Sequence, residues 1–575
     1  MRDVLFVVPV FQEDIAQECN GTLILATILK EKGIDVEIYR YYESNPEEGF
    51  EAFVENSARN ILARNPSIVS FYCRGDCYIS NIRVAEKIKN TSPNTTIVFG
   101  GPQADLSASE TIKNIPWVDY CCSGEGEKTI YPLFSGILKG EDVSSVSGLT
   151  YRNADGEVVS NPRPELLQNL DELPFIDYTL LPEKIKHQAK EAKKPVNIDV
   201  GRGCPYKCAY CSTSKFWQRK FRIKSPERIM KDVLWIEKNF GINKCVFDHD
   251  LFTVDKSKVY EFCRLIKENS VNVRWGCSSR ADTIDKDLID AMVDAGLRSM
   301  YLGIETGSER MQKLTHKNLN LDKASEIIEY LLKKDVKTTA SFIYGFPEET
   351  EEDVEQTLQF IYSLYKKNIL SVQLHLCAIF PGTEYYDTYK EQLHFTENSS
   401  DQVGDFGLKE NEEFIKEHNE LFPFYYEYRS ELRDKFVNLS RYILFVLEIY
   451  RNLNIYDPQK FAETRLVDLY LDFVKINDSL LGEMGENPDK IALINNYLSS
   501  VYPAETAEKF KEILRLNGDL ISAKHKGDAC EEIKVYNIDV NAVMEKKSLD
   551  EIAVRPVVLY IKCDNGQVTY KPRFL

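Results

Sequence analysis

The chain has 575 residues, of which 43% are hydrophobic and 28% charged, a composition typical of a globular protein with several domains. Its formal net charge of -18 disfavours a nucleic-acid backbone as a partner, because such a partner needs basic patches. The first apolar run meets acidic residues at once and no later run is long enough to span a bilayer, so neither a signal peptide nor membrane contact is expected. We predict a cytoplasmic protein with mostly reduced cysteines.

Residues 1–145 alternate between strand and helix patterns. The apolar run at 4–11 predicts a buried strand, and the spacing at 22–34 predicts an amphipathic helix. This alternation is typical of a parallel sheet with helices on both faces, so we predict a doubly wound, Rossmann-like α/β domain. Further strands of this sheet are predicted at 35–40, 67–73, 95–101 and 118–124.

The pattern changes over residues 146–190. The turn dipeptide Asp155-Gly156 lies between two alternating runs, which predicts a β-hairpin. Pro162, Pro164 and Pro174 follow it. We therefore predict a linker that contains a hairpin.

Residues 191–395 return to alternating strands and helices. Six strands with helices between them fit a partial or full β/α barrel of the TIM type, whose chemistry lies where the strands end. The strands are predicted at 196–202, 244–250, 273–279, 299–305, 338–345 and 371–380.

Residues 396–575 are predicted to be mostly helical, with a terminal β-hairpin around Asn565-Gly566. Aromatic residues gather at 422–428 in this region. They could line a substrate channel or pack one face of an element into a core, and the pattern favours the core.

Three cysteines stand within eight residues, in the stretch GRGCPYKCAYC. Cys204, Cys208 and Cys211 have the spacing C-x3-C-x2-C directly after a predicted strand. A structural zinc site needs a fourth ligand, and the nearest histidines, His187 and His249, are not paired at ligand spacing. Iron–sulfur clusters are held by cysteine thiolates, and three thiolates on a cubane leave one iron open. The spacing therefore favours a 4Fe–4S cluster over zinc.

This stretch resembles the signature of the radical S-adenosylmethionine (SAM) enzymes, and the resemblance covers about residues 190–390. It implies that the open iron chelates the amino and carboxylate groups of SAM. It also implies that an electron from the cluster cleaves SAM to methionine and a 5′-deoxyadenosyl radical, which abstracts hydrogen from a substrate. A water-excluding barrel suits such chemistry.

The resemblance also implies contacts to SAM along the later strands. FDHDLFT (247–253) stands where the family holds the amino group, and its acidic form resembles the variant of cobalamin-associated members. Carboxylates there could also cap the next helix, and the cation after the third strand could form a surface salt bridge. The glycines at 303 and 345 belong to the matching motifs. The implied SAM contacts are Tyr210, Asp248, Asp250, Arg280, Glu305 and Ser341.

A second resemblance concerns residues 1–145, which look like the cobalamin-binding domain found in front of many such barrels. GGPQAD (100–105) and SGEGE (123–127) match its glycine-rich turns, where glycine lets the backbone lie against the nucleotide tail. A degenerate domain that binds no corrin is the alternative. The implied cobalamin contacts are Tyr72, Cys73, Arg74, Gly100, Gly101, Pro102, Gly124, Glu125 and Gly126.

The first domain lacks the axial histidine of the cobalamin mutases. The first histidine of the chain is His187, so residues 1–186 supply none. The lower face of the cobalt would be left to water, to another side chain from the loop at 72–77, or to nothing. Weak donation from that face favours methyl transfer, although members that perform ring contraction or cyclisation also lack the histidine.

We therefore predict a cobalamin-dependent radical SAM enzyme that methylates an unactivated carbon of a small-molecule or peptide substrate through methylcobalamin. The alternatives are a member performing cyclisation, rearrangement or oxidation, and a radical SAM enzyme with a degenerate cobalamin domain. A tRNA-acting barrel would bring a basic module, and a cluster scaffold would need no SAM motifs. We expect an external electron donor of the flavodoxin or ferredoxin type and a monomer.

Overall fold

The structure is a computed structural model in which the chain forms two compact units. The first unit comprises Met1–Glu349 and Leu364–Asp434, and the second comprises Thr350–Ser363 and Lys435–Leu575. Each is described separately. The residues that the structure describes are 2–11, 19–182, 195–367, 369, 371–396, 406–456, 464–484, 489–525, 530–547, 551–564 and 567–574.

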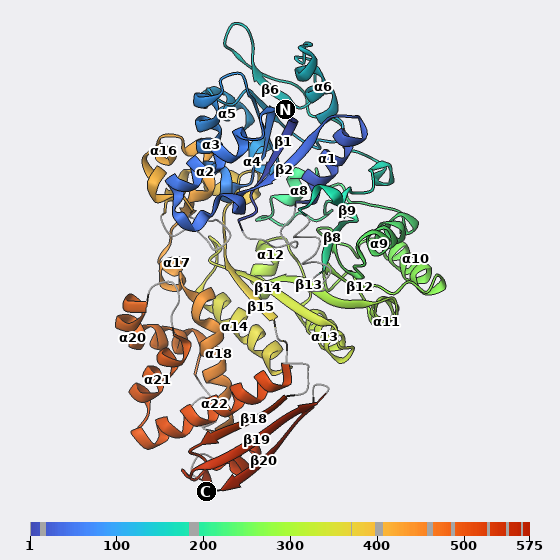
Figure 1. The fold of residues 1–575 in the computed structure, drawn as a ribbon. Helices are drawn as coiled ribbons and strands as arrows, with labels where there is room; N and C mark the ends of the chain where they lie inside the picture. Colours follow the sequence, from blue (N-terminus) through green and yellow to red (C-terminus); the bar gives the residue numbers. More distant parts are fainter. Residues whose placement is uncertain are drawn as a thin grey trace. The chain divides into compact units, whose positions relative to one another are not determined.

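The first unit begins with a seven-stranded sheet, which confirms the predicted doubly wound fold. Its first five strands are parallel. Helices α1 (Asn20–Glu31) and α6 (Ile130–Lys139) cover one face, and α2 (Phe50–Leu62), α3 (Tyr78–Thr91) and α5 (Ala108–Asn114) cover the other (Figure 1). The strand order is β2 (Val36–Arg40), β1 (Arg2–Val8), β3 (Pro66–Tyr72), β4 (Thr96–Gly100), β5 (Tyr120–Cys122), β6 (Leu149–Arg152) and β7 (Val158–Ser160).

This strand order fixes where a ligand can enter. The chain runs from β1 to β2 on one side and then returns to β3 on the other side of β1. The loops after β1 and β3 therefore diverge, and open α/β sheets bind ligands in such a crevice at the carboxyl ends of the strands. The hairpin predicted at 146–190 is present as β6 and β7, but it extends this sheet in antiparallel fashion.

The second sheet of the unit has six parallel strands, in the order β15-β14-β13-β12-β11-β8. Among the described residues β8 and β15 do not pair, so the barrel is partial. Its helices include α9 (Pro226–Phe240), α10 (Lys256–Glu268), α11 (Lys286–Asp294), α12 (Glu309–Leu314) and α13 (Leu321–Lys333). The strands are β8 (Val196–Asp199), β11 (Lys244–Asp248), β12 (Arg274–Ser279), β13 (Leu297–Glu305), β14 (Lys337–Tyr344) and β15 (Ser371–Leu376).

A short antiparallel pair follows β8. Strand β9 (Gly201–Arg202) pairs with β10 (Arg222–Ile223), and the three-cysteine motif lies in the loop between them. The short helix α8 (Thr213–Phe216) occupies the same loop. The motif is thereby held at the carboxyl end of the barrel's first strand.

Residues beyond the barrel return to the first sheet. Strand β16 (Leu393–Phe395) pairs with β17 (Tyr426–Tyr428), and the chain between them reaches the core of the doubly wound domain. Phe422, Phe424 and Tyr425 are buried in that core. Core packing is thus the role of these aromatic side chains, as the sequence favoured.

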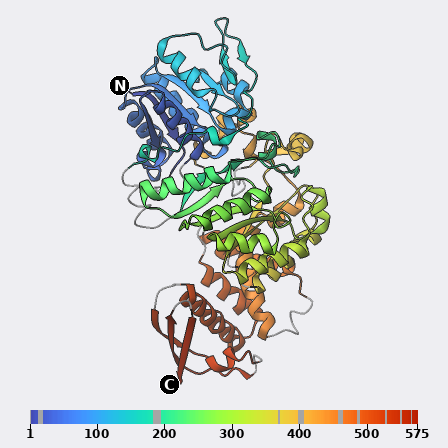
Figure 2. The same ribbon diagram turned by 90° about the vertical axis from the view of Figure 1, so that its right-hand side faces the viewer.

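The second unit combines long helices with an antiparallel sheet of three strands. The pair β19 (Val557–Asp564) and β20 (Gln567–Phe574) forms the predicted terminal hairpin, although Asn565 and Gly566 lie outside the described residues. Strand β18 (Cys530–Tyr536) pairs with β19 and was not predicted. Figures 1 and 2 show α22 along this sheet. The helices are α14 (Glu351–Lys366, most of which belongs here), α18 (Leu439–Tyr456), α20 (Leu466–Met484), α21 (Lys490–Val501), α22 (Ala504–His525) and α23 (Val540–Met544).

A helix that crosses a bilayer needs about 20 predominantly apolar residues. Within the described ranges, no helix is both long and apolar enough to cross a bilayer.

Candidate functional site

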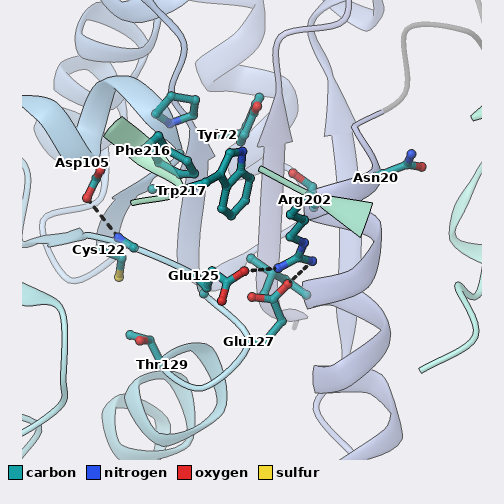
Figure 3. A pocket seen from close by; sticks show the side chains of 18 of the residues that line it. Asn20, Tyr72, Asp105, Cys122, Glu125, Glu127, Thr129, Arg202, Phe216 and Trp217 are labelled. Carbon is teal, nitrogen blue, oxygen red and sulfur yellow. Dashed lines mark hydrogen bonds and ion pairs between the residues drawn. The ribbon is translucent and has the colours of Figure 1, made fainter. Parts of the chain in front are cut away.

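A cavity of about 630 Å³ opens inside the first unit (Figure 3). One wall comes from the carboxyl ends of β3, β4 and β5, and the opposite wall comes from the loops after β8, β9 and β11. A volume of this size is typical of a ligand pocket. It lies at the crevice that the strand order of the first sheet predicts.

The wall from the doubly wound domain contains seven of the nine predicted cobalamin contacts. Gly101 and Gly124 have φ angles of 98° and 82°, a region that side chains other than glycine rarely adopt. A Cβ on Gly101 would lie 2.9 Å from the Cys73 carbonyl oxygen and 2.9 Å from the Tyr72 ring. Glycine therefore lets the turn lie close to the sheet. The lining residues among the predictions are Tyr72, Gly100, Gly101, Pro102, Gly124, Glu125 and Gly126.

Two neighbouring glycines allow a matched test of this wall. Gly101→Ala is expected to lower the free energy of unfolding by about 2 kcal/mol, because the backbone is strained and the Cβ clashes. Gly100→Ala should leave stability unchanged, since nothing lies within 4 Å of its Cβ position, but should weaken cobalamin binding roughly tenfold by filling the cavity. Urea denaturation and cobalamin titration measure the two effects. Equal cobalamin binding by Gly100→Ala and wild type would contradict the assignment.

Two predicted cobalamin contacts do not line the cavity. Cys73 is fully buried, and its thiol accepts a hydrogen bond from Asn81 at 3.4 Å. Arg74 forms an ion pair with Asp76 at 2.7 Å. The strand β3 ends at Tyr72, so the following residues turn away from the cavity.

Glu125 has a role that the sequence did not predict. Its carboxylate accepts hydrogen bonds from Arg202 at 2.8 Å and Arg222 at 2.9 Å, both from the barrel, and from the backbone N–H of Leu167. Burial acts to raise the pKa of Glu125, but the two guanidinium groups outweigh it and hold this pKa below its usual value. The carboxylate is therefore engaged in joining the two parts of the unit.

Arg202 extends this buried network. It also pairs with Glu127 at 2.6 Å and with Asp199 at 3.2 Å, and Figure 3 shows its guanidinium between the two glutamates. Burial acts to lower the pKa of Arg202, but Glu127, Asp199 and Glu125 outweigh it and raise this pKa. Arg202 precedes the first cysteine of the motif by two positions. Its ion pairs therefore anchor the motif to the cavity wall that the doubly wound domain forms.

Asp105 forms a second link at the cavity. Its carboxylate accepts hydrogen bonds from the Gly124 N–H at 2.9 Å and from Arg163 at 2.8 Å. Burial raises the pKa of Asp105 despite these partners. Through these two hydrogen bonds Asp105, at the end of the first glycine turn, is joined to the second glycine turn and to the segment that follows β7.

The three cysteines lie in one loop whose backbone is fixed at several points. The Gly203 N–H donates to Asp250 at 2.9 Å, and the Ala209 N–H donates to the Thr315 carbonyl at 3.0 Å. Burial, with lesser contributions from Cys211 and Cys208, raises the pKa of the Cys204 thiol to about 11. In the described part of the chain, no three His, Cys, Asp or Glu side chains converge on a single metal ion. A cubane spreads its thiolates over different irons, so its ligands need not converge on one point.

Arg280 lies beside this loop with an orphaned donor. Its side chain is 5% exposed and pairs with Asp282 at 2.8 Å, while Nη2 donates to the Lys317 carbonyl at 2.8 Å. The guanidinium lies 3.9 Å above the Tyr206 ring of the cysteine loop, and Nη1 is buried without a hydrogen-bond partner. A buried donor of this kind fits an acceptor such as a carboxylate, because unpaired it is costly.

Glu305 ends strand β13 with a φ angle of 72°. A non-glycine residue in this region is strained, which is typical of ligand sites. Its carboxylate accepts a hydrogen bond from Lys317 at 2.9 Å, and both side chains are largely buried. A Cβ atom on Gly303 would clash with the side chains of Glu305 and Lys317. Lys317 is a partner that the sequence analysis did not find.

Asp248 ends β11, Asp250 lies just after it, and both line the cavity. Asn20, at the start of α1, donates to Asp248 at 3.1 Å. Both residues are exposed to the cavity, and desolvation by the surrounding protein raises the pKa of both, that of Asp250 to about 6. His249 between them accepts the Leu251 N–H, and burial lowers its pKa to about 4, so it is neutral at pH 7.

The last two predicted SAM contacts lie on the barrel side. Ser341 is buried on β14 in register with Gly303 of the neighbouring strand. Tyr210, between the second and third cysteines, packs against Phe346 with ring centroids 5.8 Å apart. Burial raises the pKa of the Tyr210 hydroxyl well above its usual value. Neither residue lines the cavity, so neither faces the wall that the doubly wound domain forms.

Comparison with known proteins identifies both halves of the first unit. Residues 198–361 match the model of the radical SAM superfamily, and residues 19–133 match that of the B12 binding domain. An uncharacterized methyltransferase of Pyrococcus horikoshii is 30% identical over 57% of this chain and 71% of the relative. The chain belongs to the radical SAM superfamily. It carries a B12-binding domain in front of the radical SAM domain.

A further relative of this radical SAM protein matches a smaller part of the chain. The anaerobic magnesium-protoporphyrin IX monomethyl ester cyclase of Rubrivivax gelatinosus is 28% identical over 48% of this chain, which spans 50% of the cyclase. Among solved structures, the methyltransferase TsrM of Kitasatospora setae has a TM-score of 0.55 at 16% identity, over 68% of this chain and 78% of that one. The enzyme OxsB has a TM-score of 0.59 at 16% identity, over 91% and 81%. These two structures share the fold.

Family membership implies a 4Fe–4S cluster, SAM and cobalamin as cofactors, and the residues present fit them. Three thiols on one loop suit the cluster, and the orphaned Nη1 of Arg280 suits the SAM carboxylate. The cavity with its glycine turns suits cobalamin. Arg202, Arg222 and Trp217 were missed because nothing in a single sequence distinguishes buried charged or aromatic side chains from exposed ones.

Proposed function

We propose that this protein is a cobalamin-dependent radical SAM methyltransferase that methylates an unactivated carbon of a small-molecule or peptide substrate. The observation that carries the proposal is the shared cavity. Ser212, which directly follows the third cysteine, lines it together with Asp250 and the glycine turns of the B12-binding domain. One cofactor that generates a radical and another that carries a methyl group could therefore act on one bound substrate.

In this proposal the bound cofactors supply the electron, the 5′-deoxyadenosyl radical and the methyl carrier. Cys204, Cys208 and Cys211 hold the cluster. The side chain of Arg280 directs its free Nη1 to the SAM carboxylate, and the carboxylate of Asp250 accepts from the SAM ammonium. Glu305 binds the ribose hydroxyls, while Tyr210 and Ser341 flank the adenosine. Asp248, held by Asn20, lies beside the ammonium site.

The proposal includes an external reductant of the flavodoxin or ferredoxin type, because each reductive cleavage of SAM consumes an electron that the cluster must regain. We also propose that the protein acts as a monomer in the cytoplasm. Methylation is favoured by the methyltransferase relatives, whereas the cyclase relatives support a non-methylating alternative. The two differ in one product, since only methylation releases S-adenosylhomocysteine.

The first test needs no substrate. Protein reconstituted anaerobically with iron, sulfide and hydroxocobalamin is reduced and incubated with SAM. We expect S-adenosylhomocysteine, from methyl transfer to the reduced cobalamin, together with 5′-deoxyadenosine from uncoupled cleavage. Cys208→Ala should abolish 5′-deoxyadenosine, a loss of more than about a thousandfold, yet retain cobalamin.

Three results would contradict the proposal. Formation of 5′-deoxyadenosine by Cys208→Ala would remove the cluster assignment. Absence of S-adenosylhomocysteine from cobalamin-loaded protein would favour cyclisation, rearrangement or oxidation. Failure to retain cobalamin would indicate a degenerate B12-binding domain.

A further inference from the structure

The feature that neither the motifs nor the family comparison explains is Trp217. It follows α8 in the segment after the third cysteine, and it lines the cavity beside Phe216. Figure 3 shows its indole between Tyr72 on one side and the Arg202–Glu125 pair on the other. The radical SAM domain thereby places a large aromatic side chain in the cavity of the B12-binding domain.

The backbone around Trp217 is strained. Its N–H donates to the Thr213 carbonyl at 3.1 Å, and its carbonyl accepts from the Lys220 N–H at 3.0 Å, which closes a tight turn. Gln218 and Arg219 in this turn have φ angles of 53° and 56°. Each left-handed non-glycine residue costs on the order of 1 kcal/mol. Strain of this kind is retained where the position of a side chain matters.

The indole is fixed by the buried charge network. The guanidinium carbons of Arg202 and Arg222 each lie 5.6 Å from the centroid of the indole. Both cations are held by Glu125, which belongs to the glycine turn of the opposite wall. The ring of Phe216 contacts the indole edge-on at 4.6 Å between centroids. The position of Trp217 is therefore set relative to the B12-binding domain.

The surface that Trp217 presents to the cavity is only partly covered. Tryptophan usually buries most of its surface, because its apolar area is large. Gly100 and Gly124 line the same cavity and have no side chains that could cover the indole. A flat, mostly apolar ligand between glycine backbone and an indole would cover both. The corrin ring has that chemistry.

We propose that Trp217 is the barrel-side contact of cobalamin: its indole packs against the corrin and holds it against the glycine turns. This inference rests on the cobalamin binding of the proposed function. Trp217 acts as a positioning residue, and Glu125, Arg202 and Arg222 hold it in place. Because Trp217 is six residues from Cys211, it also fixes the corrin relative to the cluster loop.

Proximity can be measured directly by fluorine NMR. The chain has four tryptophans, so 5-fluorotryptophan gives four signals, assigned with single Trp→Phe variants. The reconstituted protein is loaded with hydroxocobalamin, which is diamagnetic, and then reduced by one electron to paramagnetic cob(II)alamin. We expect the Trp217 signal to broaden beyond detection, while that of Trp235 on α9, which stacks on Phe175, stays sharp. A Trp217 signal as sharp as that of Trp235 would overturn the proposal.

Binding of hydroxocobalamin provides the second measurement. Trp217→Ala is expected to weaken it roughly tenfold and Trp217→Phe less than about threefold, because the phenyl ring keeps most of the packing. The matched control, Trp235→Ala, should bind as wild type. Far-ultraviolet circular dichroism and the melting temperature of each variant show whether it is folded. Wild-type affinity in folded Trp217→Ala would overturn the proposal.

These results separate the inference from the proposed function. Wild-type protein that binds cobalamin and shows the broadening, but forms no S-adenosylhomocysteine, would contradict methyl transfer and support the role of Trp217. Broadening of neither tryptophan, with S-adenosylhomocysteine formed, would leave the methyltransferase in place and contradict the role of Trp217.

Discussion

Replacing Glu125 with glutamine is expected to lower the free energy of unfolding by about 3 kcal/mol, because it leaves a buried guanidinium without its counter-ion. Arg222 is 7% exposed. Among the described contacts, the carboxylate that pairs with it belongs to Glu125. The Nε and Nη2 atoms of Arg222 are already buried without hydrogen-bond partners. Glutamine can still accept a hydrogen bond from Arg222, as the Leu167 carbonyl does, but neither group carries the charge that balances the buried guanidinium.

Hydrogen exchange of the apo protein measures this effect locally. The amides of β9 and β10, which carry Arg202 and Arg222, should exchange about a hundredfold faster in Glu125→Gln. Glu127→Gln is the matched control, since Arg202 keeps Glu125 and Asp199 as partners. Equal protection in Glu125→Gln and wild type would show that the network does not join the two domains.

A double substitution and pH refine the result. Glu125→Gln with Arg222→Met removes both charges and should recover part of the lost protection. The folded protein holds the pKa of Glu125 below its unfolded value of 4.5. The contribution of Glu125 is therefore complete above that value and is lost as pH falls through the folded pKa. The difference between wild type and Glu125→Gln should disappear in acid.

The sequence predicted the architecture of the first unit well for a physical reason. Apolar runs that alternate with amphipathic helices specify parallel sheets, and both predicted sheets are present. Local signals do not report which elements pair at a distance. The hairpin of 149–160 therefore looked like part of a linker, although it adds two strands to the first sheet. The segment around Phe422 looked like part of a separate domain, although it packs into the first core.

The candidate site shows the same difference between features with a local sequence signal and features that depend on distant residues. Glycines and cysteines at fixed spacings carry their geometry in the sequence, so the turns at Gly101 and Gly124 and the cysteine loop were found. Glu125 was predicted as a cobalamin contact from the GEG turn, and its bonds to two arginines were not predicted. Those arginines lie 77 and 97 residues away along the chain, and no local pattern couples them.

The pH dependence of SAM binding tests the other wall of the cavity. Asp250 lines the cavity beside the cysteine loop, and desolvation by the surrounding protein, with a smaller contribution from Asp248, raises its pKa from 3.8 to about 6 although Gly203 donates to it. In the proposed site Asp250 accepts from the SAM ammonium, which requires the ionised carboxylate. We expect SAM affinity to fall roughly tenfold for each pH unit below about 6 and to level off above pH 7.

Asp250→Asn removes this dependence. The amide still accepts from Gly203 but attracts no cation, so SAM should bind about tenfold to a hundredfold more weakly at pH 7.5, with a flat profile between pH 5 and about 7. Isothermal titration of the reconstituted protein with SAM measures both effects. Asp287→Asn, on the exposed start of α11, is the control. A SAM profile in Asp250→Asn that still bends near pH 6 would assign the titrating group to another residue.

The same pKa shift has a consequence for the protein without SAM. Because the folded-state pKa of Asp250 lies above its unfolded value, the folded state binds this proton more tightly. The stability that this provides is complete below about pH 4 and is lost as pH rises through about 6. Apo Asp250→Asn should therefore have a flatter stability profile between these values. Because a bound ammonium would restore the ionised form, SAM should protect the wild type against unfolding more strongly than it protects Asp250→Asn at pH 7.5.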